Sequence, residues 1–172
     1  MKVIKTLACV GLLATLSVQA DTTKIGASLH QKFDLALNEI PAAAINAVKN
    51  KQAGITILEA EKELKHGHTY IDIEGKDADG NDIEFDLLQV GDKWKVVEIQ
   101  RDLTLAQTPK AVVSELKKQD ANIKPKRIIE SVQNDGVIIY EFYTINSKGK
   151  EGKHEVKWHQ EQASYLTKEW QH

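Results

Sequence analysis

An internal repeat constrains the fold of this chain more than any other feature of its sequence. The segment DLALNEIPAA, residues 34–43, returns as DLTLAQTPKA, residues 102–111, with the aspartate, both leucines, the proline and an alanine in register. Glycines and aromatic residues then recur in the same order after both segments. Because self-similarity at a fixed period is typical of a duplicated structural unit, the sequence predicts two copies, residues 34–101 and residues 102–172.

Each copy is expected to begin with a helix and to continue with strands. Pro41 and Pro109 suit the first turn of a helix, where a missing N–H group costs nothing. The residues that follow each helix are rich in β-formers and are separated by turn sequences such as DG and GDK. The expected strands are residues 55–64, 69–75, 82–88 and 94–99 in the first copy and residues 127–132, 137–144, 153–158 and 164–167 in the second. The predicted fold class is α+β, with a helix and an antiparallel meander in each copy.

The acidic stretch KDADGNDIEFD, residues 76–86, lies between two of these strands and has the composition of a calcium loop. An EF-hand loop needs glycine at position six and a bidentate carboxylate at position twelve. Counted from Asp77, the glycine is at position four and position twelve is Leu88. The stretch therefore predicts a hairpin turn around Asp79 and Gly80, because tight hairpins need residues that tolerate positive φ.

The first twenty residues are expected to form a secretory signal peptide. Two lysines precede an apolar run from Leu7 to Val18, and cleavage is expected after Ala20. The run is shorter than the roughly 20 residues that span a bilayer, so we expect no membrane span and a periplasmic or secreted protein. Cleavage would remove Cys9, the one cysteine of the chain, and with it any disulfide or thiolate nucleophile.

Residues 21–33 precede the first copy and are expected to form an extension. Ile25, Leu29 and Phe33 recur there at four-residue spacing, which predicts an additional amphipathic helix. Loss of the first twenty residues removes two lysines and no acids, so the net charge falls from −2 to −4. This mildly acidic charge does not favour nucleic acid as a partner.

Six positions in each copy carry a resemblance to a known family: Pro41, Val48, Gly67, Tyr70, Gly80 and Trp94 in the first copy, and Pro109, Leu116, Gly136, Tyr140, Gly149 and Tyr165 in the second. Together they resemble the PepSY-like family, over residues 34–172. In tandem they resemble the fold of the β-lactamase inhibitory proteins. The resemblance implies a helix-backed, curved antiparallel sheet whose open face binds another protein or a peptide, in some cases as an inhibitor. It implies neither an enzyme nor a cofactor.

Alternation along the expected strands predicts one open face in each copy. Because side chains alternate along a strand, the apolar residues share the face that the helix covers and the acidic residues share the other. The second copy is expected to expose Ile139, Glu141, Tyr143, Glu155 and Lys157. A basic protein or peptide is the expected partner, although acids on an ordinary solvated sheet face are the simpler alternative. The candidate partner-binding residues are Asp72, Glu74, Glu84, Asp86, Trp94, Tyr143 and Tyr165.

The sequence contains no complete catalytic motif. It has no GxSxG elbow, and GKEGKH, residues 149–154, departs from a phosphate loop. His66 and His68, with His154 or His159, are the best metal candidates, but no third ligand follows at a readable spacing. We therefore expect a non-enzymatic binding module without a resident metal or cofactor. A small metal-binding protein and an envelope-stress factor stay open as alternatives.

Overall fold

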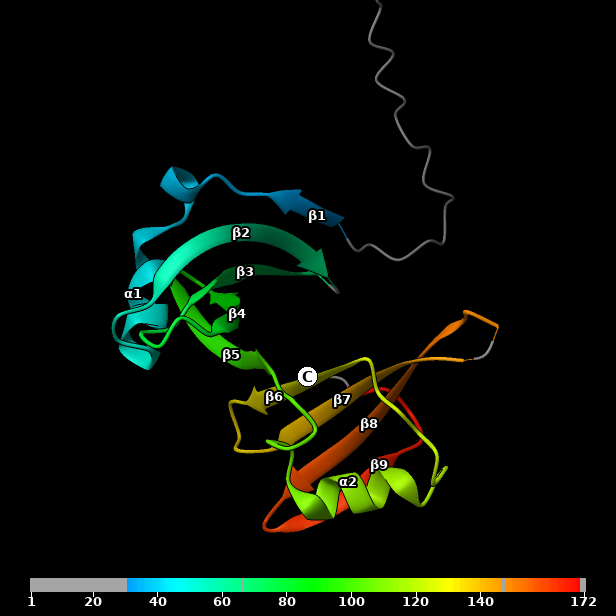
Figure 1. The fold of residues 1–172 in the computed structure, drawn as a ribbon. Helices are drawn as coiled ribbons and strands as arrows, with labels where there is room; N and C mark the ends of the chain where they lie inside the picture. The colour runs from blue at the N-terminus through cyan, green and yellow to red at the C-terminus, as the bar shows by residue number, and fades with distance from the viewer. Residues whose placement is uncertain (1–30, 66, 147, 171–172) are drawn as a thin grey trace, which may run out of the picture.

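The computed structural model describes residues 31–65, 67–146 and 148–170 (Figure 1). Its described strands all belong to one antiparallel sheet and follow one another across it in chain order. The helices are α1 (Ala42–Lys51) and α2 (Lys110–Lys117), and a 3-10 turn, η1 (Leu37–Glu39), precedes α1. The strands are β1 (Gln31–Asp34), β2 (Thr56–Lys65), β3 (His68–Lys76), β4 (Asp82–Val90), β5 (Lys93–Asp102), β6 (Arg127–Gln133), β7 (Ile138–Ile145), β8 (Glu151–His159) and β9 (Gln162–Leu166).

Strands β2 to β9 correspond to the strands expected from the sequence, and the α+β class with an antiparallel sheet is confirmed. Strand β1 was not expected. Phe33, which the sequence pattern assigned to a helix, lies in β1 and is paired with Lys62 of β2. The signal peptide and most of the segment 21–33 lie outside the described residues. Within the described part of the chain, no helix is long and apolar enough to cross a bilayer.

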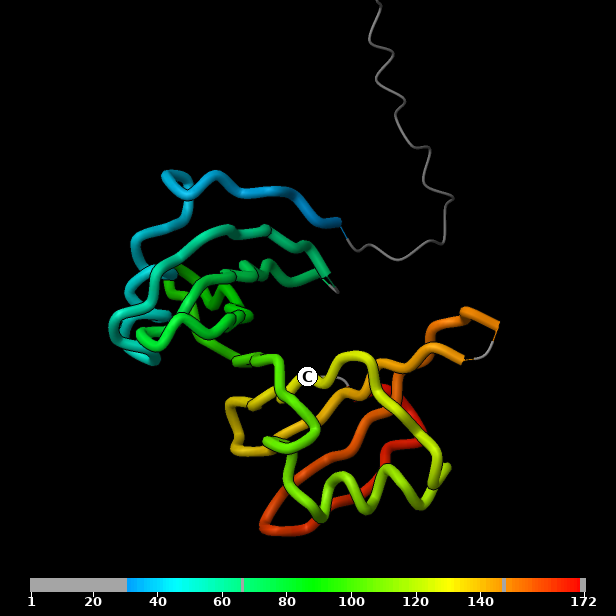
Figure 2. The backbone as a smooth tube through the Cα atoms, viewed as in Figure 1, coloured from blue at the N-terminus to red at the C-terminus, as the bar shows by residue number. Residues whose placement is uncertain are grey.

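Both helices begin directly after a proline, because Pro41 and Pro109 are their N-cap residues. The apolar stripe of α1, which includes Val48, packs into a core formed with the apolar side chains of β2 to β5. That of α2, which includes Leu116, packs into a second core with β6 to β9. The two helices lie on the outer side of the curved sheet, and the backbone bends between β5 and β6 (Figures 1 and 2). Among the residues that the structure describes, no helix covers the inner face of the sheet.

The hairpin between β3 and β4 is confirmed at the Asp-Gly position. Gly80 has a φ of 85°, in the left-handed region that glycine adopts without steric cost. Asp77 fixes the turn, since its Oδ1 accepts hydrogen bonds from the backbone N–H groups of Asp79 and Asn81, both at 2.9 Å. This acid therefore has a local structural role in the turn.

A β-bulge in β5 changes which side chains face the open side of the sheet. Asp86 of β4 is opposite Glu98, but the next residue, Leu87, is opposite Val96. Val97 is thus an extra residue that reverses the alternation of the strand. As a result, Val96 faces the core while Glu98 joins the open face.

Candidate functional site

The four acids predicted for the open face of the first half lie together. Asp72 is directly opposite Asp86, and Glu74 is directly opposite Glu84, in the register of β3 and β4. Residues directly opposite one another in an antiparallel pair have Cα atoms about 4.5–5.5 Å apart. The neighbouring apolar side chains of both strands, such as Phe85, are fully buried on the helix side. The strands therefore hold four carboxyl groups in two facing pairs.

Further carboxylates extend this cluster onto β2 and β5. Glu59 is opposite Glu74 and Glu61 is opposite Asp72, while Glu98 is opposite Asp86. Like charges that face each other across strands destabilise a sheet, so this arrangement carries an electrostatic cost. We call the eight residues of this surface the acidic face: Glu59, Glu61, Glu63, Asp72, Glu74, Glu84, Asp86 and Glu98.

Lys32 of β1 neutralises part of this charge. Its Nζ lies 3.1 Å from Glu61 Oε2 and 3.1 Å from Asp72 Oδ2. Burial lowers the pKa of Lys32, but the hydrogen bonds to the two carboxylates outweigh it, and the pKa is raised overall. Burial raises the pKa of Asp72 although Lys32 opposes the shift.

Carboxyl groups of the acidic face bind protons at higher pH than usual, in one case close to neutral pH. Burial, followed by the charges of Glu74 and Asp72, raises the pKa of Glu84 to about 7. Burial and a hydrogen bond with the Glu59 carboxyl group raise the pKa of Glu74. Burial and the charge of Glu98 hold the pKa of Asp86 well above its usual range. Each shift has the sign expected when a carboxylate loses water and gains negative neighbours.

Two hollows flank the acidic face near Glu59 and Glu74, which line both of them. The first, of about 390 Å³, runs between the acids and Arg127, whose Nε is 2.9 Å from Asp102 Oδ1. The second, of about 320 Å³, adds the apolar side chains Leu35, Leu37 and Leu58 to carboxylates of β1, β2 and β3. The surface thus offers negative charge next to exposed apolar groups.

Of the predicted aromatic residues, Tyr143 lies on the open side, but Trp94 and Tyr165 do not flank the acids. Trp94 packs against the core of the first half. Tyr165 packs against the core of the second half, where its hydroxyl lies 2.9 Å from Nδ1 of His154. Tyr143 donates a hydrogen bond of 2.5 Å to Oε2 of Glu141.

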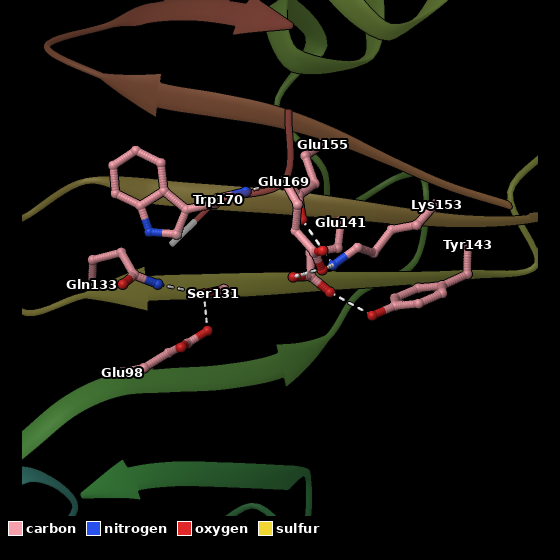
Figure 3. Close-up of polar contacts among 9 residues, drawn as sticks. All are labelled: Glu98, Ser131, Gln133, Glu141, Tyr143, Lys153, Glu155, Glu169 and Trp170. Atoms are coloured by element: carbon pink, nitrogen blue, oxygen red, sulfur yellow. Dashed lines mark hydrogen bonds and ion pairs between the residues drawn. The ribbon is translucent and has the colours of Figure 1, made fainter. Parts of the chain in front are cut away.

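On the open side of the second half, Lys153 connects several acids (Figure 3). Its Nζ lies 2.8 Å from Glu155 Oε1, 2.6 Å from Glu169 Oε1 and 3.6 Å from Glu141 Oε1. The register of β7 and β8 places Glu141 opposite Glu155, as the register of β3 and β4 places Asp72 opposite Asp86. The second half therefore has a lysine among its facing acids, and its charge differs from that of the acidic face.

Three of the histidine candidates, His68, His154 and His159, lie in the described residues. His66 lies outside the described residues. His68 makes an edge contact with Tyr70, with ring centroids 6.5 Å apart, and His154 contacts Tyr165. In the described ranges, no three histidine, cysteine or acidic residues are placed to hold a metal ion.

Sequence reasoning missed the acids of β2 and β5, together with Lys32 and Lys153. Glu59, Glu61 and Glu63 alternate with period two, so this signal was present in the sequence. Glu98 had no such signal, because the bulge at Val97 reverses its expected face. No model of a known protein family matches the chain, and a comparison with curated proteins finds no match.

Proposed function

We propose that this chain is an exported, non-enzymatic binding module that captures a basic segment of a protein or peptide on its acidic face. The observation that carries the proposal is the cross-strand opposition of carboxylates over β2 to β5, with raised pKa values at its centre. Strongly perturbed carboxyl groups that gather on one surface are candidates for a functional site. A cationic partner would relieve the repulsion among them.

The contrast with an ordinary sheet surface supports a binding role. Exposed faces of antiparallel sheets are commonly polar, but favourable cross-strand pairs join opposite charges. Here Glu74 has acids opposite it on both neighbouring strands, Glu59 and Glu84. The sheet keeps this arrangement despite its cost, which is expected where stability is exchanged for function.

The flanking hollows suggest the chemistry of the partner. One hollow brings Glu74 and Glu84 together, and the other places Leu37 and Leu58 beside Glu74. The side chains of Leu37 and Leu58 are about half exposed, at 49% and 52%. A segment with lysine or arginine residues next to apolar residues would match both the charge and the apolar surface.

We also propose that the two halves are tandem copies of a PepSY-like unit that is exported by the N-terminal signal. Support comes from the order of elements, since α1 precedes four antiparallel strands and α2 precedes four more. Asp34 and Asp102 each end a strand, and the residue after each of them donates an equivalent backbone hydrogen bond. Leu35 N–H donates to the carbonyl of Ala60 and Leu103 N–H to that of Ile128, both at 2.9 Å.

Fluorescence anisotropy with a labelled peptide of alternating lysine and leucine tests the proposal. We expect the peptide to bind the full chain and to be released by salt, while a peptide of alternating glutamate and leucine should not bind. Glu74 is exposed and Glu84 is half-buried on the face of the sheet opposite α1. Glu74→Lys combined with Glu84→Lys should abolish binding, and an unchanged circular dichroism spectrum would show that the variant still folds.

The matched control changes the same charge elsewhere. Glu151 and Glu161 are exposed residues of the second half, and their combined replacement by lysine should leave binding of the basic peptide within about threefold of wild type, as expected for distant charges screened by salt. Equal loss in both double variants, or full binding by the Glu74 and Glu84 double variant, would overturn the proposal.

A further inference from the structure

The last described residues, 167–170, form a C-terminal segment that folds back over the open side of the second half. Beyond β9, the chain places Glu169 and Trp170 against side chains of β7 and β8 (Figure 3). This segment has no regular secondary structure. Its position is therefore determined by side-chain contacts with the sheet.

One acid and one lysine of β8 hold this segment. Lys153 Nζ donates a hydrogen bond of 2.6 Å to Oε1 of Glu169. The backbone N–H of Trp170 donates one of 2.6 Å to Oε2 of Glu155. Glu155 is itself buried, with 4% of its surface exposed, and its other oxygen lies 2.8 Å from Lys153. The sheet thus recognises both a carboxylate and the backbone of the residue that follows it.

Polar side chains of β5 and β6 lie on the open side of the sheet, the side on which the indole of Trp170 also lies (Figure 3). Figure 3 shows the indole on the same side of the sheet as Gln133 and Ser131. Gln133 Nε2 donates a hydrogen bond of 2.7 Å to Ser131 Oγ, which donates to Glu98. The indole Nε1 is buried but has no hydrogen-bond partner among the described residues. The ring is therefore placed on the sheet without a partner for its polar group.

We propose that the open side of β6–β8 is a peptide-binding site for an extended segment in which an acidic residue precedes an aromatic one, and that the C-terminal segment occupies it as a displaceable internal ligand. Lys153 binds the carboxylate and Glu155 binds the next backbone N–H group, while the ring lies on the same side of the sheet as Ser131 and Gln133. This site differs from the acidic face in its residues and in the charge of its ligand.

The contacts of the internal ligand favour exchange. The side chain of Glu169 is 67% exposed, so its ion pair with Lys153 is open to water and salt. The unsatisfied indole N–H group of Trp170 lowers the gain from burying the ring. A tethered segment nevertheless has an effective concentration on the order of millimolar. An external peptide must therefore compete with it.

The test uses the full chain and a fluorescein-labelled peptide of sequence TKEWQH, which copies residues 167–172. In one variant, Glu169→Gln combined with Trp170→Ala vacates the site. We expect this variant to bind the peptide about tenfold or more tightly than wild type, because the competing tether is lost. The peptide TKQAQH should bind neither protein. Equal affinity of the vacated variant and wild type would overturn the proposal.

Two further measurements separate the site from a general structural effect. In the vacated background, Lys153→Met should abolish peptide binding, whereas Lys150→Met, at an exposed turn residue, should not. In wild type labelled with 5-fluorotryptophan, excess peptide should shift the fluorine resonance that Trp170→Phe identifies. Binding that survives Lys153→Met, or a Trp170 resonance that stays unchanged at saturating peptide, would contradict the proposal even if the vacated variant folds poorly.

Discussion

Glu74 lies directly opposite Glu84 on the open face of β3 and β4. Burial is the largest cause of the raised pKa of both groups, and each also feels the charge of neighbouring acids. Asp72 and Asp86 form a second facing pair beside them, again with raised pKa values. These four groups couple the stability of the sheet and the charge of its open face to pH.

Stability should increase as the solution is acidified from about pH 8 to about pH 5, because carboxyl groups whose pKa is raised by folding bind protons more tightly in the folded state. The stabilisation that these carboxyl groups contribute is complete below their pKa in the unfolded chain. It is lost as the pH rises through their pKa in the folded protein, which is about 7 for Glu84. The pKa values of Asp77 and Glu169 are lowered, so these two groups change the stability of the protein only at more acidic pH. Urea unfolding at the two pH values measures the difference.

Glu84→Gln should remove much of this pH dependence. The variant should be more stable than wild type at about pH 8 by on the order of 2 kcal/mol, once solvent screening is allowed for, and similar to wild type at about pH 5. Glu161→Gln, at an exposed turn residue, serves as the control and should leave the pH profile unchanged. Equal stability of wild type at both pH values would contradict the assigned shifts.

Lys32→Met should destabilise the protein more at about pH 8 than at about pH 5. Asp72 is 6% exposed and is 3.1 Å from Lys32, so loss of the lysine leaves a buried carboxylate beside other acids. We expect a loss on the order of 1–3 kcal/mol at the higher pH, and less at the lower pH, where Asp72 can bind a proton. Chemical unfolding measures both values. Lys62→Met, at an exposed position of the neighbouring strand β2, should have little effect, and equal losses in the two variants would refute this role of Lys32.

The strand alternation made part of the candidate site predictable. The period of two is unbroken in β3 and β4, from the cross-strand pair Tyr70 and Leu88 near one end of the register to the pair Gly75 and Ile83 near the other. Acids and apolar residues therefore separate onto opposite faces as the pattern predicts. The acids of β2 follow the same rule, since Ala60 faces the core between them.

Other parts of the site depend on tertiary structure that local patterns do not encode. The bulge at Val97 brings Glu98 to the acidic face. Simple alternation along β5 would instead place Glu98 on the core side of the sheet, together with Trp94. Trp170 follows the last strand without any periodic pattern, and its position depends on Glu155, which is distant in sequence. Sequence spacing alone could not predict either relationship.

Asp77, and not Asp79, should be the acid that stabilises the β3–β4 hairpin. Asp77→Ala removes the acceptor for two backbone N–H groups and should lower the melting temperature, because local side-chain bonds to the backbone fix such turns. Asp79→Asn should change it little. Added calcium should also change it little, since a ligand at a hundredfold excess over its dissociation constant would raise it by several degrees. A calcium-dependent rise that Asp79→Asn abolishes would show that the turn is a metal site.

Capture of a basic peptide by the acidic face should be pH-dependent. Glu84 is partly protonated near pH 7 because its pKa is raised to that value, and a cationic side chain beside it would favour the charged form. Binding should therefore release protons and weaken as the pH falls from about 8 to about 6. Titration calorimetry of the lysine–leucine peptide in buffers of different ionisation enthalpy measures this proton release.

Glu84→Gln is the variant that isolates the effect. It should bind the peptide more weakly than wild type at about pH 8 and show a smaller dependence on pH, because the group that titrates nearest neutrality is gone. Glu161→Gln should keep the wild-type profile. If wild type binds the peptide equally at both pH values and the heat does not depend on the buffer, Glu84 does not contact the bound cation, and the partner lies elsewhere on the acidic face, toward Glu61 and Lys32.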